Sequence, residues 1–272
     1  MMRKILISVA PVSALDKHID PEKIAKDVIA CSRAGAGMVH LHVRDTKGNL
    51  TPDLTVLKET ADRIRSQCDI IIQASTGGVS NLTIKERCAP VSAPWVEAAS
   101  LNVGSVNLGD QVYCNPIKDV EYCVQQILKY KKVPEIEVFE LGMIKTSRDL
   151  ADKYHMPLPL LFSVVLGHIG ASPATSRTLR ALVGGIEEFF GKQEALWGIT
   201  HAHRRDFEIV EEAVELGAST VRIGFEDSNY LAPDMQVDEN LPLVERVREI
   251  LNQHGAEAAT AEEGRRMLRI GE

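Results

Sequence analysis

Short and nearly continuous apolar runs alternate along the chain with segments in which apolar residues recur every three or four positions. Runs of the first kind are typical of parallel β-strands that are covered on both faces. Segments of the second kind predict amphipathic helices. The predicted strands are residues 4–10, 38–43, 70–75, 98–103, 136–141, 160–166, 196–200 and 220–223.

The predicted helices lie between these strands, and two of them have clear start signals. Asp20 and Thr51 each precede a proline, so a capping side chain comes before a residue that suits the first helical turn. The first of these helices ends near Gly35. Further helices are predicted at residues 118–130, 146–154, 176–190, 206–216 and 241–252, with a weaker one at 83–88.

This alternation of strand and helix predicts an α/β protein built as a (β/α)₈ TIM barrel. We expect residues 1–272 to form one barrel domain, with a charged, helical extension at 256–272. An open, doubly wound sheet is the alternative. The first predicted strand is not followed by the GxGxxG loop that often marks such sheets.

Composition narrows the class of protein. The chain is 44% hydrophobic and 25% charged, which is ordinary for a globular protein. Its formal net charge of −7 argues against a nucleic-acid partner, and no apolar run is long enough to predict a membrane span. Five cysteines without a CxxC pair favour a reduced, cytoplasmic protein. The apolar amino terminus is interpreted as a strand rather than a secretion signal.

Two histidines, His40 and His42, interrupt the apolar run of the second predicted strand. Side chains alternate along a strand, so both imidazoles project from the same face, roughly 7 Å apart along the chain. Imidazoles held in this way suit two of the ligand positions of a zinc ion. They also suit hydrogen bonding within a polar layer of the barrel, because buried polar groups need partners.

Active sites of TIM barrels lie at the carboxyl ends of the strands. Glu226 follows the eighth predicted strand, which lies near the second, so its carboxylate is the expected third ligand. Two histidines and one glutamate leave at least one coordination position of a zinc ion open for substrate, as catalytic sites require. A second pair, His201 and His203, competes for the metal, although Arg204 beside it favours a solvated loop.

Other polar residues at these strand ends indicate how a substrate is held. The run from Ser75 to Gly78 offers hydroxyls and backbone N–H groups for a carboxylate or phosphate, or else is a plain tight turn. Asp227, close to Arg222, is either a general base oriented by the arginine or part of a surface ion pair. His168 lines the substrate pocket or belongs to a polar loop.

Six short motifs occur in a fixed order over nearly the whole chain. They are VHLHVR at 39–44, IQASTGG at 72–78, SLNVG at 100–104, PEIEV at 134–138, VLG at 165–167 and RIGFED at 222–227. Together they resemble the β-keto acid cleavage enzymes, the family that includes the 3-keto-5-aminohexanoate cleavage enzyme. The resemblance implies a zinc-dependent barrel enzyme that converts a β-keto acid and acetyl-CoA into acetoacetate and a new acyl-CoA, and it suggests a homotetramer.

The resemblance also implies a role for each matching residue. His40, His42 and Glu226 match the zinc ligands of the family. Asp227 matches the base and Arg222 its partner. The remaining matches concern the substrate pocket: Ser75, Gly78 and Ser100 at positions that hold the substrate carboxylate, Asn102 near them, and Glu137 as an acidic residue of the pocket.

One departure from the family bears on the substrate. The aminohexanoate enzyme has a glutamate near the end of its first strand to meet the substrate amine, and the matching position here is at about Leu15. The neighbouring Asp16 could take that role only if the loop shifts. We therefore expect a neutral or acidic β-keto acid. His168, Arg177 and Arg180 are the candidate partners of a second carboxylate.

Two other functions fit parts of the pattern. A metal-dependent TIM-barrel hydrolase of amide or ester bonds would use a zinc-bound hydroxide. Hydrolases of that type commonly carry an HxH motif on the first strand, and residues 5–10 contain none. A non-catalytic zinc or acyl-CoA binding protein would have no need for Asp227 beside Glu226.

Overall fold

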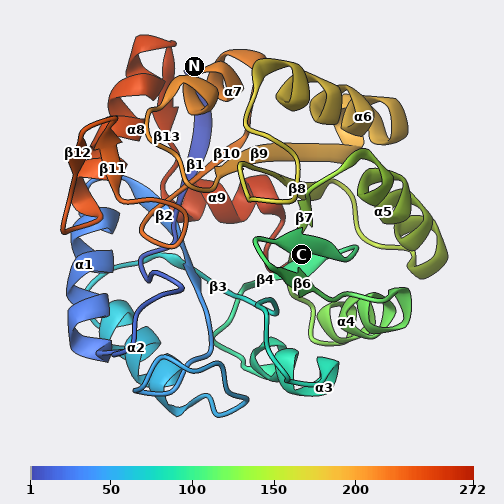
Figure 1. Ribbon diagram of the computed structural model, residues 1–272, viewed down its shortest axis with the longest axis horizontal. Helices are drawn as coiled ribbons and strands as arrows, with labels where there is room; N and C mark the ends of the chain where they lie inside the picture. Colours follow the sequence, from blue (N-terminus) through green and yellow to red (C-terminus); the bar gives the residue numbers. More distant parts are fainter. Residues whose placement is uncertain (1) are drawn as a thin grey trace.

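The protein is described by a computed structural model that covers residues 2–272 (Figure 1). Parallel strands form a ring in the order β10-β9-β8-β7-β4-β3-β2-β1, and β10 closes it by pairing with β1 from Leu6–Thr220 to Val9–Ile223. The predicted (β/α)₈ barrel is therefore confirmed. The strands are β1 (Arg3–Val9), β2 (Ala36–Leu41), β3 (Ile71–Ala74), β4 (Ala98–Asn102), β7 (Val133–Val138), β8 (Leu160–Leu166), β9 (Ala195–His201) and β10 (Thr220–Ile223).

Helices surround this barrel (Figure 1). The predicted cap at Asp20 is present, because its carboxylate accepts a hydrogen bond of 2.9 Å from the backbone N–H of Glu22. The helices are α1 (Pro21–Arg33), α2 (Thr55–Arg65), α3 (Ile84–Arg87), α4 (Ile117–Lys129), α5 (Leu141–Tyr154), α6 (Ser176–Glu194), α7 (Glu208–Leu216) and α8 (Leu241–Gln253), with a 3₁₀ turn at Ala89–Ser92.

The boundaries of several predicted elements are wrong. The fifth strand occupies Val133–Val138 rather than 136–141, and helix α5 already begins at Leu141. The sequence hides this start because no side chain caps it and Gly142 follows directly. The helix expected at Thr51 begins at Thr55, where Asp53 accepts a hydrogen bond of 3.0 Å from the backbone N–H of Thr55.

The carboxyl-terminal segment is only partly helical. Ala256–Ala258 forms β13, which pairs in parallel with the beginning of β1 at Arg3–Ile5. Helix α9 (Ala261–Leu268) follows, with a capping box at Thr260 and Glu263. Its apolar residues form a cluster with side chains from the amino-terminal half of the strands, namely Leu6, Met38, Ile71 and Leu161. The helix thus closes the end of the barrel opposite the site described below.

Two short hairpins were not predicted. β5 (Val106–Leu108) pairs with β6 (Gln111–Tyr113) after β4, and β11 (Tyr230–Ala232) pairs with β12 (Met235–Gln236) after β10. Both follow the carboxyl ends of barrel strands and so extend that rim of the barrel (Figure 1). A hydrogen bond of 2.8 Å from the N–H of Gly109 to the carbonyl of Ile169 ties the first hairpin to the loop after β8.

The alternation of side chains along the strands decides what faces the barrel interior. Val39 and Leu41 of β2 belong to the cluster packed against the surrounding helices, as Ile7 of β1 does. The residues between them point the other way, so His40 faces the interior of the barrel. Among residues 2–272, no helix combines the length and apolar character needed to cross a bilayer.

Candidate active site

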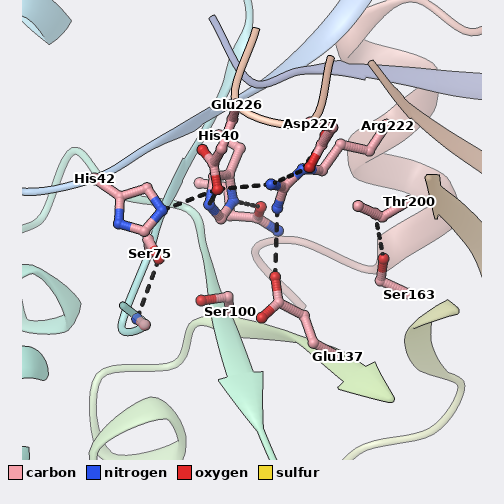
Figure 2. Close-up of polar contacts among 12 residues, drawn as sticks. His40, His42, Ser75, Ser100, Glu137, Ser163, Thr200, Arg222, Glu226 and Asp227 are labelled. Carbon is pink, nitrogen blue, oxygen red and sulfur yellow. Dashed lines mark hydrogen bonds and ion pairs between the residues drawn. The ribbon is translucent and has the colours of Figure 1, made fainter. Parts of the chain in front are cut away.

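Three side chains that sequence analysis singled out meet at the carboxyl end of the barrel. His40 lies on β2, His42 follows that strand directly, and Glu226 follows β10. The carboxylate oxygen Oε1 of Glu226 lies 3.0 Å from Nε2 of His42 and 3.8 Å from Nε2 of His40 (Figure 2). One ligand atom from each residue lies within 4.8 Å of the others. Among residues 2–272 this is the single cluster of its kind.

Arg222 connects this cluster with two further carboxylates. Its Nε and Nη2 donate to the two oxygens of Asp227, each at 3.0 Å, and Nη2 also donates to Glu226 at 2.7 Å. On its other side, Nη1 donates to Glu137 at 3.4 Å (Figure 2). The guanidinium therefore fixes the positions of three carboxylates from two different strand ends.

Burial and charge oppose one another in this cluster. Burial raises the pKa of Asp227, and the neighbouring Arg222 cation limits the rise. Burial also acts to raise the pKa of Glu226, but Arg222 and the two imidazoles outweigh it and hold that pKa well below its usual range. Burial lowers the pKa of His40 to about 3. His40 is therefore neutral near pH 7, which is the state required of a metal ligand.

The donor set fits a divalent metal such as zinc. Two imidazole nitrogens and one carboxylate oxygen are ligands that zinc accepts, and such a set leaves room for substrate. The charge fits as well, because Glu226, Asp227 and Glu137 share the single guanidinium of Arg222. A divalent cation would offset the excess of buried negative charge.

The run from Ser75 to Gly78 forms a turn at the end of β3, beside β4. The hydroxyl of Ser100 accepts a hydrogen bond of 3.1 Å from the N–H of Thr76, and the Thr76 hydroxyl donates to the Ser100 carbonyl at 2.7 Å. Gly78 has φ +119, which L side chains rarely adopt, and an added Cβ would lie 2.5 Å from Leu50. The turn thus brings the hydroxyls of Ser75 and Ser100 close to backbone N–H groups.

Asn102 and Glu137 lie side by side on neighbouring strands, β4 and β7. The Asn102 amide donates to the Glu137 carboxylate, while its own Oδ1 is buried without a hydrogen-bond partner among residues 2–272. Burial raises the pKa of Glu137, against the lowering effects of Arg222 and Asn102. This pair joins the end of β4 to the arginine-centred cluster, because Glu137 is also bonded to Arg222.

The second histidine pair is not part of the cluster around Glu226. The ring of His203 lies against that of His168 instead, with the two ring centroids 5.6 Å apart. Burial lowers the pKa of His168 to about 4, so the ring is neutral near pH 7. Arg204 is buried rather than solvated, and it donates to the carbonyl of Tyr230 at 2.6 Å. The expected solvated loop is therefore wrong at Arg204.

Leu15, in the loop after β1, and the two candidate arginines on α6 lie at the surface of the protein. Leu15 is 81% exposed. Arg177 is exposed, and Arg180, also exposed, forms an ion pair of 2.7 Å with Glu212. The position of Leu15 therefore carries an exposed apolar side chain rather than an acidic one, and Arg180 is already paired with Glu212.

Sequence analysis assigned no role to two buried residues behind His40, although both lie in its motifs. Gln73 of β3 accepts a hydrogen bond from Nδ1 of His40 at 2.5 Å, and its amide donates to Glu135 of β7 at 2.6 Å. The available signal was their polarity: Gln73 interrupts an apolar run, and Glu135 lies in a strand.

A sequence model of the β-keto acid cleavage enzyme family matches residues 5–270. The chain belongs to this family. It is 34% identical over 278 residues to a 3-keto-5-aminohexanoate cleavage enzyme of Acetoanaerobium sticklandii, a match that covers 99% of each chain. It is 27% identical over 300 residues to a 3,5-dioxohexanoate:acetyl-CoA acetone transferase of Paraburkholderia graminis, covering 98% of this chain and 96% of that one.

The fold is also shared with a solved structure, the apo structure of ObcA. The two superpose with a TM-score of 0.78 at 20% identity, over 93% of this chain and 65% of that chain. At this identity the likeness concerns the fold alone, and the chain spans about 65% of the length of ObcA. Membership of the cleavage family makes the protein a C–C bond-cleaving acyl transferase, and favours that activity over the hydrolase alternative.

Proposed function

We propose that this protein is a zinc-dependent β-keto acid cleavage enzyme that uses acetyl-CoA as its second substrate. The observation that carries the proposal is the junction of two groups at one end of the barrel. His40, His42 and Glu226 offer a ligand set for a metal, and the Arg222–Asp227 pair adjoins it through Glu226. The names of the two relatives, a keto acid cleavage enzyme and an acetyl-CoA transferase, support the same reaction.

The metal site of this proposal is formed by His40, His42 and Glu226. When bound there, zinc supplies Lewis acidity that makes the carbon between the keto and carboxylate groups of the substrate more acidic. Hydrogen bonds from neighbouring side chains hold two of these three ligands in place. Glu226 is fixed by its hydrogen bond of 2.7 Å from Arg222, and His40 by its bond of 2.5 Å to Gln73.

The Ser75–Gly78 turn is proposed to hold the substrate carboxylate. Its support is the concentration of polar groups at the ends of β3 and β4, where the hydroxyls of Ser75 and Ser100 accept from the N–H groups of Gly77 and Thr76. Gly78 follows directly, and its lack of a side chain leaves its backbone open to a close approach. Asn102, two residues after Ser100 on β4, is proposed to lie near the bound substrate; its amide donates to Glu137, so its Oδ1 can only accept a hydrogen bond. Hydroxyl and backbone N–H donors form charge-assisted hydrogen bonds with a carboxylate.

Asp227 is the proposed base, and Arg222 positions it. Asp227 removes a proton from the carbon between the two carbonyl groups of the keto acid. The resulting carbanion attacks the thioester carbon of acetyl-CoA and displaces the CoA thiolate, which then adds to the former keto carbon. The C–C bond between that carbon and the former carbanion carbon breaks, and the carbon that leaves takes back the proton held by Asp227, which releases acetoacetate and a new acyl-CoA. Glu137, which Arg222 also contacts, belongs to the same pocket.

The substrate is proposed to be a neutral or acidic β-keto acid. The aminohexanoate enzymes need an acidic partner for the amine of their substrate, whereas this chain has the exposed Leu15 at about that position. His168 is the candidate contact for the far end of the substrate, since it lies in the rim beside Phe139, at 6.0 Å between ring centroids. A homotetramer and a cytoplasmic location remain predictions.

The experiment that tests the proposal is a product assay with purified, zinc-loaded protein. Acetyl-CoA is offered with cationic, neutral and anionic β-keto acids, and acetoacetate is measured. We expect acetoacetate with the neutral or anionic acids. Removal of the metal with a chelator should abolish the product, and the product should return only when zinc is added back. Absence of acetoacetate with every acid, in protein that binds zinc, would contradict the proposal.

A further inference from the structure

A buried chain of three side chains leads from the middle of the barrel to His40. His40 and Gln73 are directly opposite each other in the pairing of β2 with β3. The hydrogen bonds are 2.5 Å from His40 Nδ1 to Gln73 Oε1 and 2.6 Å from Gln73 Nε2 to Glu135 Oε2. All three residues are at most 2% exposed. This chain lies beneath the cluster of His40, His42 and Glu226, on the side away from solvent.

The direction of these hydrogen bonds determines which nitrogen of His40 carries the proton. A glutamine amide can present either its oxygen or its NH₂ group to a neighbour. An ionised Glu135 can only accept, so it takes the NH₂ group and leaves Oε1 of Gln73 facing His40. The imidazole must then place its proton on Nδ1. Its Nε2, which faces Glu226 at 3.8 Å, retains the lone pair that a metal ion requires.

The opposite direction would disable the site. With the Gln73 amide reversed, its NH₂ group would face Nδ1 of His40, and the imidazole proton would move to Nε2. That N–H would point at the position of the metal. A carboxylate at Glu135 excludes this arrangement, because it would face the amide oxygen of Gln73 without a proton between them.

We propose that Gln73 and Glu135 are positioning residues that lock His40 into its Nδ1–H tautomer and thereby prepare Nε2 to bind the metal. This inference rests on the proposed function for the identity of the metal site. It also gives a reason for the burial of Glu135. A carboxylate that is only 2% exposed loses its hydration, which lowers the stability of the fold. Burial raises the pKa of Glu135 to about 7, so the lock is fully formed above neutral pH.

The test reads the tautomer of His40 in the metal-free protein at about pH 8.5, above the range in which Glu135 is protonated. Protein labelled with ¹⁵N at histidine gives a distinct pattern of couplings for each tautomer, and His40 is assigned by its loss in His40→Asn. We expect the Nδ1–H tautomer in the unsubstituted protein. The Nε2–H tautomer would overturn the proposal without reference to any variant.

Three variants connect the tautomer with metal binding. Gln73→Leu removes the acceptor for Nδ1–H, and Glu135→Gln removes the group that gives the chain its direction. We expect Gln73→Leu to weaken zinc binding by about 10–100-fold and Glu135→Gln by about 10-fold, with a mixed tautomer population in both. The exchange Gln73→Glu with Glu135→Gln restores an acceptor beside His40, and should return the zinc affinity to within about threefold of the original.

The matched control is Ser163→Ala. Ser163 is also buried in the barrel, where its hydroxyl bonds to Thr200 at 2.7 Å, but it takes no part in the chain to His40. Zinc affinity and the His40 tautomer should not change in this variant. Equal affinities across all the variants would overturn the proposal. If the affinities follow the expected order but the protein makes no acetoacetate, the locking role is supported and the proposed function fails instead.

Discussion

Arg222 holds Asp227 by two hydrogen bonds of 3.0 Å, one to each carboxylate oxygen. The same guanidinium also donates to Glu226 at 2.7 Å. The proposed base and a proposed metal ligand therefore share one rigid, planar partner. A movement of the guanidinium would shift both carboxylates, so we expect Arg222 to couple the proposed proton removal to the proposed metal binding.

Replacing Arg222 with lysine tests this coupling. An ammonium group keeps the charge but cannot donate from two fixed positions to the carboxylate of Asp227. We expect Arg222→Lys to lower kcat on the order of 100-fold, with a smaller change in KM. Arg205→Lys is the matched control, because Arg205 is exposed and contacts the carbonyl of Pro233. Similar kcat values for both variants would rule out the positioning role of Arg222.

Replacing Glu226, the carboxylate among the three proposed metal ligands, tests its part in zinc binding. Glu226→Gln keeps the size of the side chain but removes its charge, and an amide is a poor ligand for zinc. We expect zinc affinity to fall at least about 100-fold while the barrel remains folded. Equilibrium dialysis against zinc, with circular dichroism as the check on folding, measures this. Unchanged binding in a folded variant would remove Glu226 from the metal site.

Ser100 offers a comparison between two conservative changes. Its hydroxyl accepts a hydrogen bond of 3.1 Å from the N–H of the buried Thr76. Ser100→Ala leaves that N–H unpaired, which costs about 1–3 kcal/mol and loosens the turn proposed to hold the substrate carboxylate. We expect KM for the keto acid to rise about 10-fold in Ser100→Ala. Ser100→Thr keeps the hydroxyl and should retain a KM close to the original value.

The buried Glu135 gives a prediction for stability against pH. Burial raises the pKa of this carboxyl from 4.5 to about 7. A raised pKa in the folded state means that the contribution of Glu135 to stability is complete below pH 4.5 and is lost as the pH rises to about 7. The Glu135→Gln variant cannot lose a proton there. Relative to the original protein, it should gain on the order of 3 kcal/mol in its free energy of unfolding across this range.

Urea denaturation of both metal-free proteins at about pH 5 and about pH 8 measures this gain. Chelator is present in every sample, so that bound metal does not contribute. The relevant quantity is the difference between the two proteins at each pH, because other ionisable groups affect both equally. If this difference is the same at both pH values, Glu135 does not have a raised pKa in the folded protein.

Much of the fold and the position of the three clustered residues could be predicted from local patterns. Continuous apolar runs marked the barrel strands, and alternation along β2 indicated that His40 and His42 share a face. Glu226 could be added because closure of the barrel brings the end of β10 near β2. These inferences need only strand geometry and the order of the strands.

The parts that could not be predicted depend on contacts between distant segments. The hydrogen bond between Gln73 and Glu135 joins residues that are 62 positions apart in the sequence. No local pattern indicates which polar side chains inside a barrel will contact one another. The start of α5 at Leu141 has no capping side chain to mark it. β13 is a strand only because the edge of β1 is available for pairing. In each case the tertiary structure supplies the partner.

An isotope label in acetyl-CoA distinguishes C–C bond cleavage with acyl transfer from hydrolysis of the thioester. Acetyl-CoA labelled with ¹³C in its acetyl group is incubated with zinc-loaded protein and a neutral β-keto acid. We expect the label in the acetyl half of acetoacetate, and CoA recovered as the thioester of the substrate's own acyl group. Labelled acetate with free CoA, or unlabelled acetoacetate, would show that the protein does not catalyse the proposed cleavage.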